Sequence, residues 1–190
     1  MFQIFVIAVY AYFPKQRMLP QPMMTNSVKW KTALVAQLLF VIQGFGLILA
    51  GLVITYFGST TVFVPQDLEY LGISVEAIKN LHPNLIPLIA HDRCTFGGML
   101  ISSGVLIALR ALWGFEPGQC WLWWSYLISG FPAYLITLGI HSHIGYESFV
   151  HLLPVFIGLG LLACSLILSF PYFFIPKMRL SILRTDTRQT

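Results

Sequence analysis

The side chains best suited to chemistry gather at one end of the predicted helices. All five histidines, and five of the seven acidic residues, fall on one side of the apolar blocks. Ionisable groups at membrane level are energetically costly, so by default they indicate function. The candidate polar cluster consists of His91, Asp92, Arg93, His141, Glu147 and His151.

Three kinds of ligand suit this set of side chains. Zinc, iron and copper accept imidazole together with carboxylate, so His91, His141 and His151 are candidate metal ligands, with Glu147 as a fourth. Haem iron could be held by two histidines from facing helices, such as His91 with His141 or His151. A quinone would hydrogen-bond to a histidine or to Arg93. No motif selects among a metal ion, haem and a quinone, and the reaction, if there is one, stays open.

The same residues also have a purely structural interpretation. Polar side chains at helix ends meet water and lipid headgroups. Asp92 would cap the second span, and Glu147 suits the positive N-terminal end of the fourth. Arg93 would then pair with Asp92 or Glu147, or reach a lipid phosphate.

Four long apolar blocks must position these residues. The chain is 57% hydrophobic and only 9% charged, whereas a soluble domain carries about 25% charged residues. Each block is near the roughly 20 residues that a helix needs to cross a bilayer, and the alternating pattern of barrel strands is absent. The sequence therefore predicts an all-α, four-helix integral membrane bundle with spans at 33–57, 96–113, 121–140 and 149–170.

Basic residues indicate the orientation of the bundle. With four spans, nine lysines and arginines share the side of the two termini, and only Lys79 and Arg93 lie opposite. This positive-inside bias predicts cytoplasmic termini in a bacterial inner (plasma) membrane. The formal charge of +4 follows from this topology, so we expect no nucleic-acid partner.

Three regions follow from these patterns. Residues 1–30 form an N-terminal extension, either a stretch before the true start or a helix on the membrane surface, and the former is favoured. Residues 31–175 form the four-helix domain, and 176–190 a basic cytoplasmic tail. The 58–92 connection should contain a short extracytoplasmic helix, because Ser74 suits an N-cap and Pro83 ends it.

Small residues predict where the helices touch. Gln37, Gly44, Gly51 and Gly58 recur every seven residues in the first span. Such stripes let membrane helices approach closely. Gly98 and Gly158 are expected to do the same in the second and fourth spans. The expected partners are the lipid bilayer, and a membrane-protein partner or a second copy of the chain.

Several phrases together resemble a family of small bacterial four-helix membrane proteins with no assigned activity. They are Val-Pro-Gln-Asp-Leu from Val64, Asn-Leu-Ile-Pro-Leu-Ile-Ala-His-Asp-Arg from Asn84, Phe-Gly-Gly from Phe96 and Gly-Tyr-Glu-Ser-Phe-Val-His-Leu-Leu-Pro from Gly145. The resemblance covers residues 30–175. It implies the four-span topology and draws attention to the motifs at the histidine-rich end, but it supplies no mechanism.

Three functions remain open at this level. The first is a site for a metal, haem or quinone in the histidine-rich pocket. The second is a non-catalytic accessory subunit of a membrane complex or a lipid-binding protein. A small transporter ranks last, because substrate sites in transporters usually lie near the midplane and no charged residue is expected there.

Overall fold

The computed structural model describes residues 28–175, which form six helices and no strand. Four of them are long and apolar enough to cross a membrane, as predicted. The predictions for the N-terminal extension and the basic tail fall almost entirely on 1–27 and 176–190, outside the described residues. The helices are α2 (Val28–Ser59), α3 (Pro65–Leu71), α4 (Val75–Leu81), α5 (Leu85–Trp113), α6 (Cys120–Ile144) and α7 (Phe149–Phe173).

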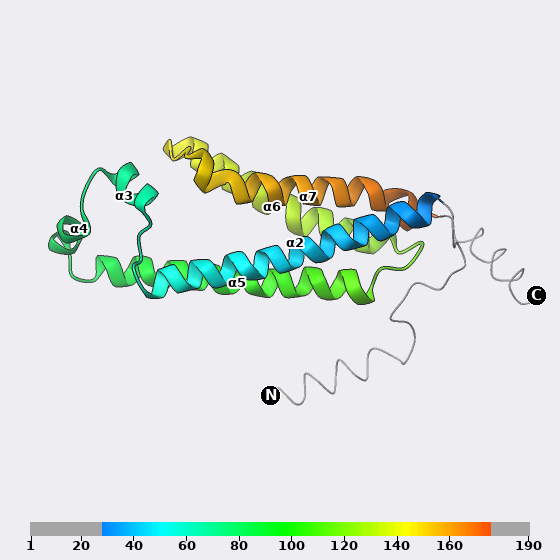
Figure 1. Cartoon of the computed structure of the whole chain (residues 1–190), viewed down its shortest axis with the longest axis horizontal. Helices are drawn as coiled ribbons and strands as arrows, with labels where there is room; N and C mark the ends of the chain where they lie inside the picture. Colours follow the sequence, from blue (N-terminus) through cyan, green and yellow to red (C-terminus); the bar gives the residue numbers. More distant parts are fainter. Residues whose placement is uncertain (1–27, 176–190) are drawn as a thin grey trace, which may run out of the picture.

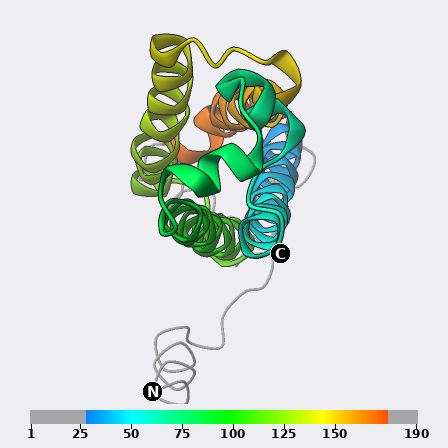
Figure 2. The same ribbon diagram turned by 90° about the vertical axis from the view of Figure 1, so that its left-hand side faces the viewer.

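The long helices form two antiparallel pairs. Helix α2 packs along α5, α6 packs along α7, and α2 joins the pairs through its contact with α7. Figure 1 shows the two pairs side by side, with α3 and α4 at one end. Seen from that end, α3 and α4 lie across the bundle (Figure 2). We call this the polar end, and the opposite end, with the 114–119 connection, the aromatic end.

Glycines set the contact between α2 and α5, as predicted from Gly44 and Gly51. A Cβ on Gly44 would lie 2.8 Å from the carbonyl oxygen of Gly104, and one on Gly51 would lie 2.5 Å from that of Gly97. The Gln37 side chain continues the seam and donates to the Ala111 carbonyl at 2.8 Å. Residues spaced seven apart on α2 therefore contact residues spaced seven apart on α5.

Gly98 does not belong to this seam, contrary to the sequence prediction. A Cβ there would meet nothing within 4 Å, whereas its neighbour Gly97 faces α2. Consecutive helical residues lie about 100° apart, so only one of the pair can face the partner. Gly158 does lie in a helix contact, because a Cβ there would fall 2.5 Å from the Tyr134 hydroxyl oxygen.

An aromatic core closes the aromatic end. The Phe40 and Tyr126 rings stack with centroids 3.9 Å apart, which links α2 to α6. Phe115, from the 114–119 connection, packs against Phe173 at 4.6 Å and against Tyr172 at 5.8 Å. This connection therefore also contributes to the core and does more than join two spans.

Two short helices cover the polar end. The predicted helix in the 58–92 connection is α4, and its N-cap Ser74 accepts a hydrogen bond from the Ala77 amide at 3.2 Å. Ile78 anchors α4 in a small apolar cluster with α5. Helix α3 was not predicted. Pro65 occupies its first turn, and the Asp67 carboxylate accepts from the Val64 amide, two features that favour a helix start.

Helix α5 begins earlier than the sequence suggested. It starts at Leu85 rather than near 96, and Asn84 is its N-cap residue. His91, Asp92 and Arg93 thus lie inside the helix, on different faces. Asp92 is not the cap of this span, contrary to the structural interpretation of the sequence.

Candidate functional site

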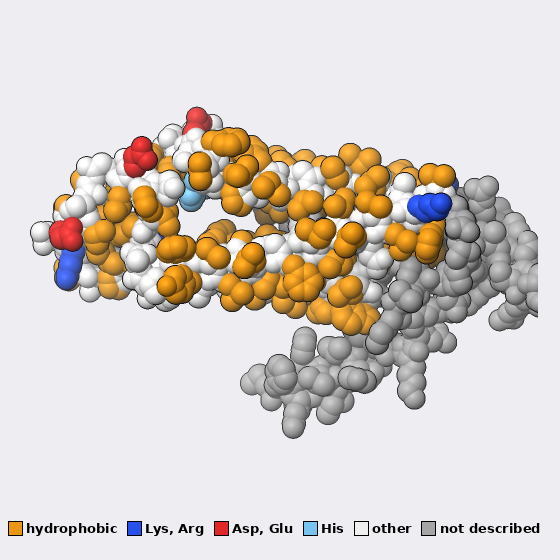
Figure 3. Space-filling model, in the orientation of Figure 1, with side chains coloured by type: hydrophobic (Ala, Val, Ile, Leu, Met, Phe, Trp, Pro, Cys, Tyr) orange, Lys and Arg blue, Asp and Glu red, His pale blue; other side chains and the backbone are white. Residues whose placement is uncertain are grey.

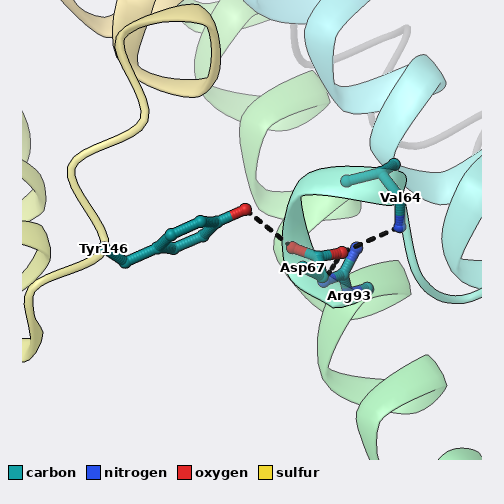
Figure 4. A network of polar contacts seen from close by, with 4 residues as sticks. All are labelled: Val64, Asp67, Arg93 and Tyr146. Atoms are coloured by element: carbon teal, nitrogen blue, oxygen red, sulfur yellow. Dashed lines mark hydrogen bonds and ion pairs between the residues drawn. The ribbon is translucent and has the colours of Figure 1, made fainter. Parts of the chain in front are cut away.

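A buried carboxylate, Asp67, holds the polar end together. Its side chain is only 8% exposed. One carboxylate oxygen accepts from the Val64 amide at 2.9 Å and from the Arg93 guanidinium at 2.7 Å. The other oxygen accepts from the Tyr146 hydroxyl at 3.0 Å. Figure 4 shows these bonds converging from α3, α5 and the turn between α6 and α7.

Arg93 supplies the charge that Asp67 needs. A buried carboxylate is stable only if it is paired and its remaining lone pairs are satisfied. The guanidinium lies 5.8 Å from the centre of the Phe63 ring, which covers part of its surface. Arg93 therefore pairs with Asp67 on α3, and not with Asp92 or Glu147 as the sequence suggested.

Tyr146 ties the α6–α7 turn to α3. Its ring lies 4.8 Å from that of Tyr70, whose hydroxyl donates to the Ile144 carbonyl at 2.6 Å. Burial and the adjacent Asp67 carboxylate raise the pKa of Tyr146 to about 12. The phenol thus stays protonated at neutral pH and remains a hydrogen-bond donor.

Two of the predicted histidines lie against Tyr146. The His151 ring is 4.7 Å from the tyrosine ring and 5.4 Å from the ring of His141. The Nδ1 of His141 bonds to the Thr137 carbonyl at 2.8 Å. Because a carbonyl oxygen only accepts, this nitrogen must carry the proton, and in the neutral ring Nε2 is left as an acceptor.

The other predicted residues lie apart from this group. His91 and Asp92 bond to each other at 3.1 Å, and each side chain is 73% exposed. The Glu147 carboxylate accepts from the Ser142 hydroxyl at 2.9 Å, on the exposed side of the turn. The structure thus brings together Arg93, His141 and His151 from the predicted cluster, and leaves His91, Asp92 and Glu147 outside.

The geometry gives no support to the predicted metal site. Within residues 28–175, no three His, Cys, Asp or Glu side chains are placed so that they could hold an ion. His91 is turned away, and the two remaining histidines face an aromatic ring. Groups that donate and accept hydrogen bonds dominate the polar end.

Sequence reasoning missed Asp67 and Tyr146 as site residues. Asp67 carried a signal, because it stands two residues after a proline at a position typical of a helix start. A lone Arg93 beside an apolar span also indicated an anionic partner. Nothing in the local sequence, however, indicated which of the five acids on that side would meet it.

The bundle has an opening near its polar end. Figure 3 shows a gap through the molecule, between the α2–α5 pair and the α6–α7 pair, in the half nearer α3 and α4. A histidine side chain is visible at the end of the gap nearest α3. The gap is flanked by apolar side chains of the long helices, so in a bilayer it would open to lipid.

Comparison with protein families, curated proteins and solved structures finds no match to this chain. The fold and the site therefore rest on the chain's own residues and geometry.

Proposed function

We propose that this protein is a multi-pass membrane protein that binds a lipid-soluble molecule by its polar group at the polar end. The site consists of Asp67, Arg93, His141, Tyr146 and His151. Two observations carry the proposal. A buried ion pair, a tyrosine and two histidines lie together at the polar end. A gap opens sideways between apolar helices, with a histidine at its end (Figure 3).

The chemistry of these groups favours a hydroxyl or carbonyl as the bound group. The Nδ1 of His141 is engaged by the Thr137 carbonyl, so its free Nε2 faces the ligand as an acceptor when the ring is neutral, and His151 can donate or accept. Ligand pockets are mostly apolar, with a few polar groups that fix orientation. Among the ligands considered from sequence, a quinone or hydroquinone matches this description better than a metal ion, which would need more ligand side chains.

Binding can be tested with octylhydroquinone and protein in lipid nanodiscs. We expect saturable binding, and His151→Ala should weaken it about tenfold, which corresponds to one lost hydrogen bond of about 1.4 kcal/mol. His91→Ala is the matched control, because this exposed histidine should leave affinity unchanged. Absence of saturable binding, or equal loss in both variants, would refute the proposal. A haem absorption band or bound metal in the purified protein would also contradict it.

The orientation belongs to the same proposal. Lys29, Lys31 and Arg110 lie toward the aromatic end, and the positive-inside rule then places both termini in the cytoplasm and the polar end outside, in the plasma membrane. Cysteines introduced at Lys79 and Glu116 provide the test, in a protein whose three native free cysteines are replaced by serine. A membrane-impermeant maleimide applied to intact cells should label position 79 and not 116. The reverse pattern would overturn the orientation.

A further inference from the structure

A second polar group lies deeper in the bundle, at Gln43. This side chain extends from α2, and its residue is only 3% exposed. The amide nitrogen donates to the Tyr134 hydroxyl at 3.0 Å and to the Gly158 carbonyl at 3.3 Å. The amide oxygen Oε1 is buried and has no hydrogen-bond partner among the described residues. A buried acceptor without a donor is energetically costly, so this atom favours an additional hydrogen-bond donor.

The amide orientation is set by its neighbours. The Gly158 carbonyl can only accept, so the NH₂ group must face it, which leaves Oε1 as the free atom. Oε1 is therefore an acceptor that needs an O–H or N–H donor. Because the side chain reaches from α2 to α6 and α7, it lies between the two helix pairs that border the opening.

Gln43 and the polar end are related by helix geometry. Tyr134 lies seven residues before His141 on α6, and Gly158 lies seven residues after His151 on α7. Seven residues are two helical turns, so each pair shares a face and is separated by about 10 Å along the axis. The same two faces thus carry both polar groups, one above the other.

The half of α6 that covers Gln43 is the less firmly packed half. Its buried side chains, Leu122 and Tyr126, both lie near the aromatic end. Pro132 lies inside α6, where it removes a backbone hydrogen bond and weakens the helix locally. Bending at Pro132 would carry Tyr134 away from Gln43 and uncover Oε1.

We infer that the ligand carries a hydroxyl that donates to Gln43 Oε1. This hydroxyl lies about 10 Å from the part of the ligand that binds the polar end. This inference rests on the proposed function, because the polar end holds the other end of the same molecule. The ligand class is a lipid-soluble molecule with a polar group at each end and an apolar body that fills the opening. Tyr134 and Gly158 position the amide.

Two probes test this inference: octylhydroquinone, and the same molecule with a hydroxyl at the end of its octyl tail. For each protein in nanodiscs, we take the ratio of the dissociation constants of the two probes. This ratio should favour the hydroxylated probe about tenfold more in the wild-type protein than in Gln43→Leu, as one hydrogen bond predicts. Comparing variants with the same probe cancels its partition into lipid. Gln37→Leu is the matched control, because it makes the same change on the α5 side of α2, and it should keep the preference.

Each outcome has a distinct meaning. The deeper site would be refuted if Gln43→Leu lowered the affinity for octylhydroquinone and for its hydroxylated form equally. It would also be refuted if Gln43→Leu still preferred the hydroxylated probe as the wild-type protein does. Dependence on His151 in the same samples would then leave the proposed function standing. If neither probe binds the wild-type protein, both proposals fail.

Discussion

Replacing Asp67 by asparagine removes the charge at the centre of the polar end while keeping its shape. Arg93 then loses its ionic partner although it is mostly buried. Removing one partner of a fully buried pair costs about 3–5 kcal/mol. Since Arg93 is 29% exposed, solvent recovers part of that cost, and we expect a loss of about 2–3 kcal/mol.

The loss should be local, because Asp67 belongs to α3 and connects it to α5 and to the α6–α7 turn. Hydrogen–deuterium exchange of the α3 amides measures the free energy of local opening. A loss of about 2–3 kcal/mol corresponds to exchange roughly 30- to 150-fold faster. Amides in the middle of α2 should keep their rates.

Glu69→Gln provides the control, since this acid lies on the exposed side of the same helix. A double-mutant cycle of Asp67→Asn with Arg93→Gln isolates the ion pair, and we expect a coupling of about 2 kcal/mol. Coupling below about 0.5 kcal/mol, within ordinary additivity error, would show that the pair does not hold α3 in place.

Three further predictions concern packing and titration. Gly97→Ala should lower the free energy of unfolding in detergent by about 1–3 kcal/mol, because the added Cβ would meet the α2 backbone. Gly98→Ala should be neutral or slightly stabilising, because a Cβ there would enter open space. Gly158→Ala should lower the melting temperature by pushing on a tyrosine hydroxyl of α6, while Gly160→Ala should not. The Tyr146 phenol should titrate near pH 12 in the difference between wild-type and Tyr146→Phe absorbance. Its stabilising contribution should be complete below about pH 10 and lost as the pH rises through 12, so a transition at pH 10 would contradict the assigned contacts.

The long helices could be predicted because their signal is local and large. Apolar blocks of membrane length specify spans without any knowledge of neighbours. The Gly44–Gly51 repeat even predicted a seam, since the spacing repeats on one helix. The partner stripe through Gly97 and Gly104 was missed because Gly97 and Gly98 are adjacent, and the choice between them depends on how α5 is rotated.

The candidate site could be predicted only in part. His141 and His151 follow from a short turn that keeps two helix ends together. His91 lies at a similar depth in the membrane, but depth does not fix the direction of a side chain. Because α5 starts at Leu85, His91 lies within the helix, on its exposed face. Asp67 depended on where a long connection folds back, which is a tertiary property.

The glycine seam between α2 and α5 also has a consequence for biogenesis. These two helices are neighbours in the chain, joined only by the segment that holds α3 and α4, and their contact needs nothing from α6 or α7. Domains are made and folded from the N-terminal side during synthesis, so this hairpin can assemble before the second one leaves the ribosome. Defects in the seam should therefore appear as misassembly and rapid proteolysis in the cell, whereas defects at the polar end should yield a protein that accumulates normally.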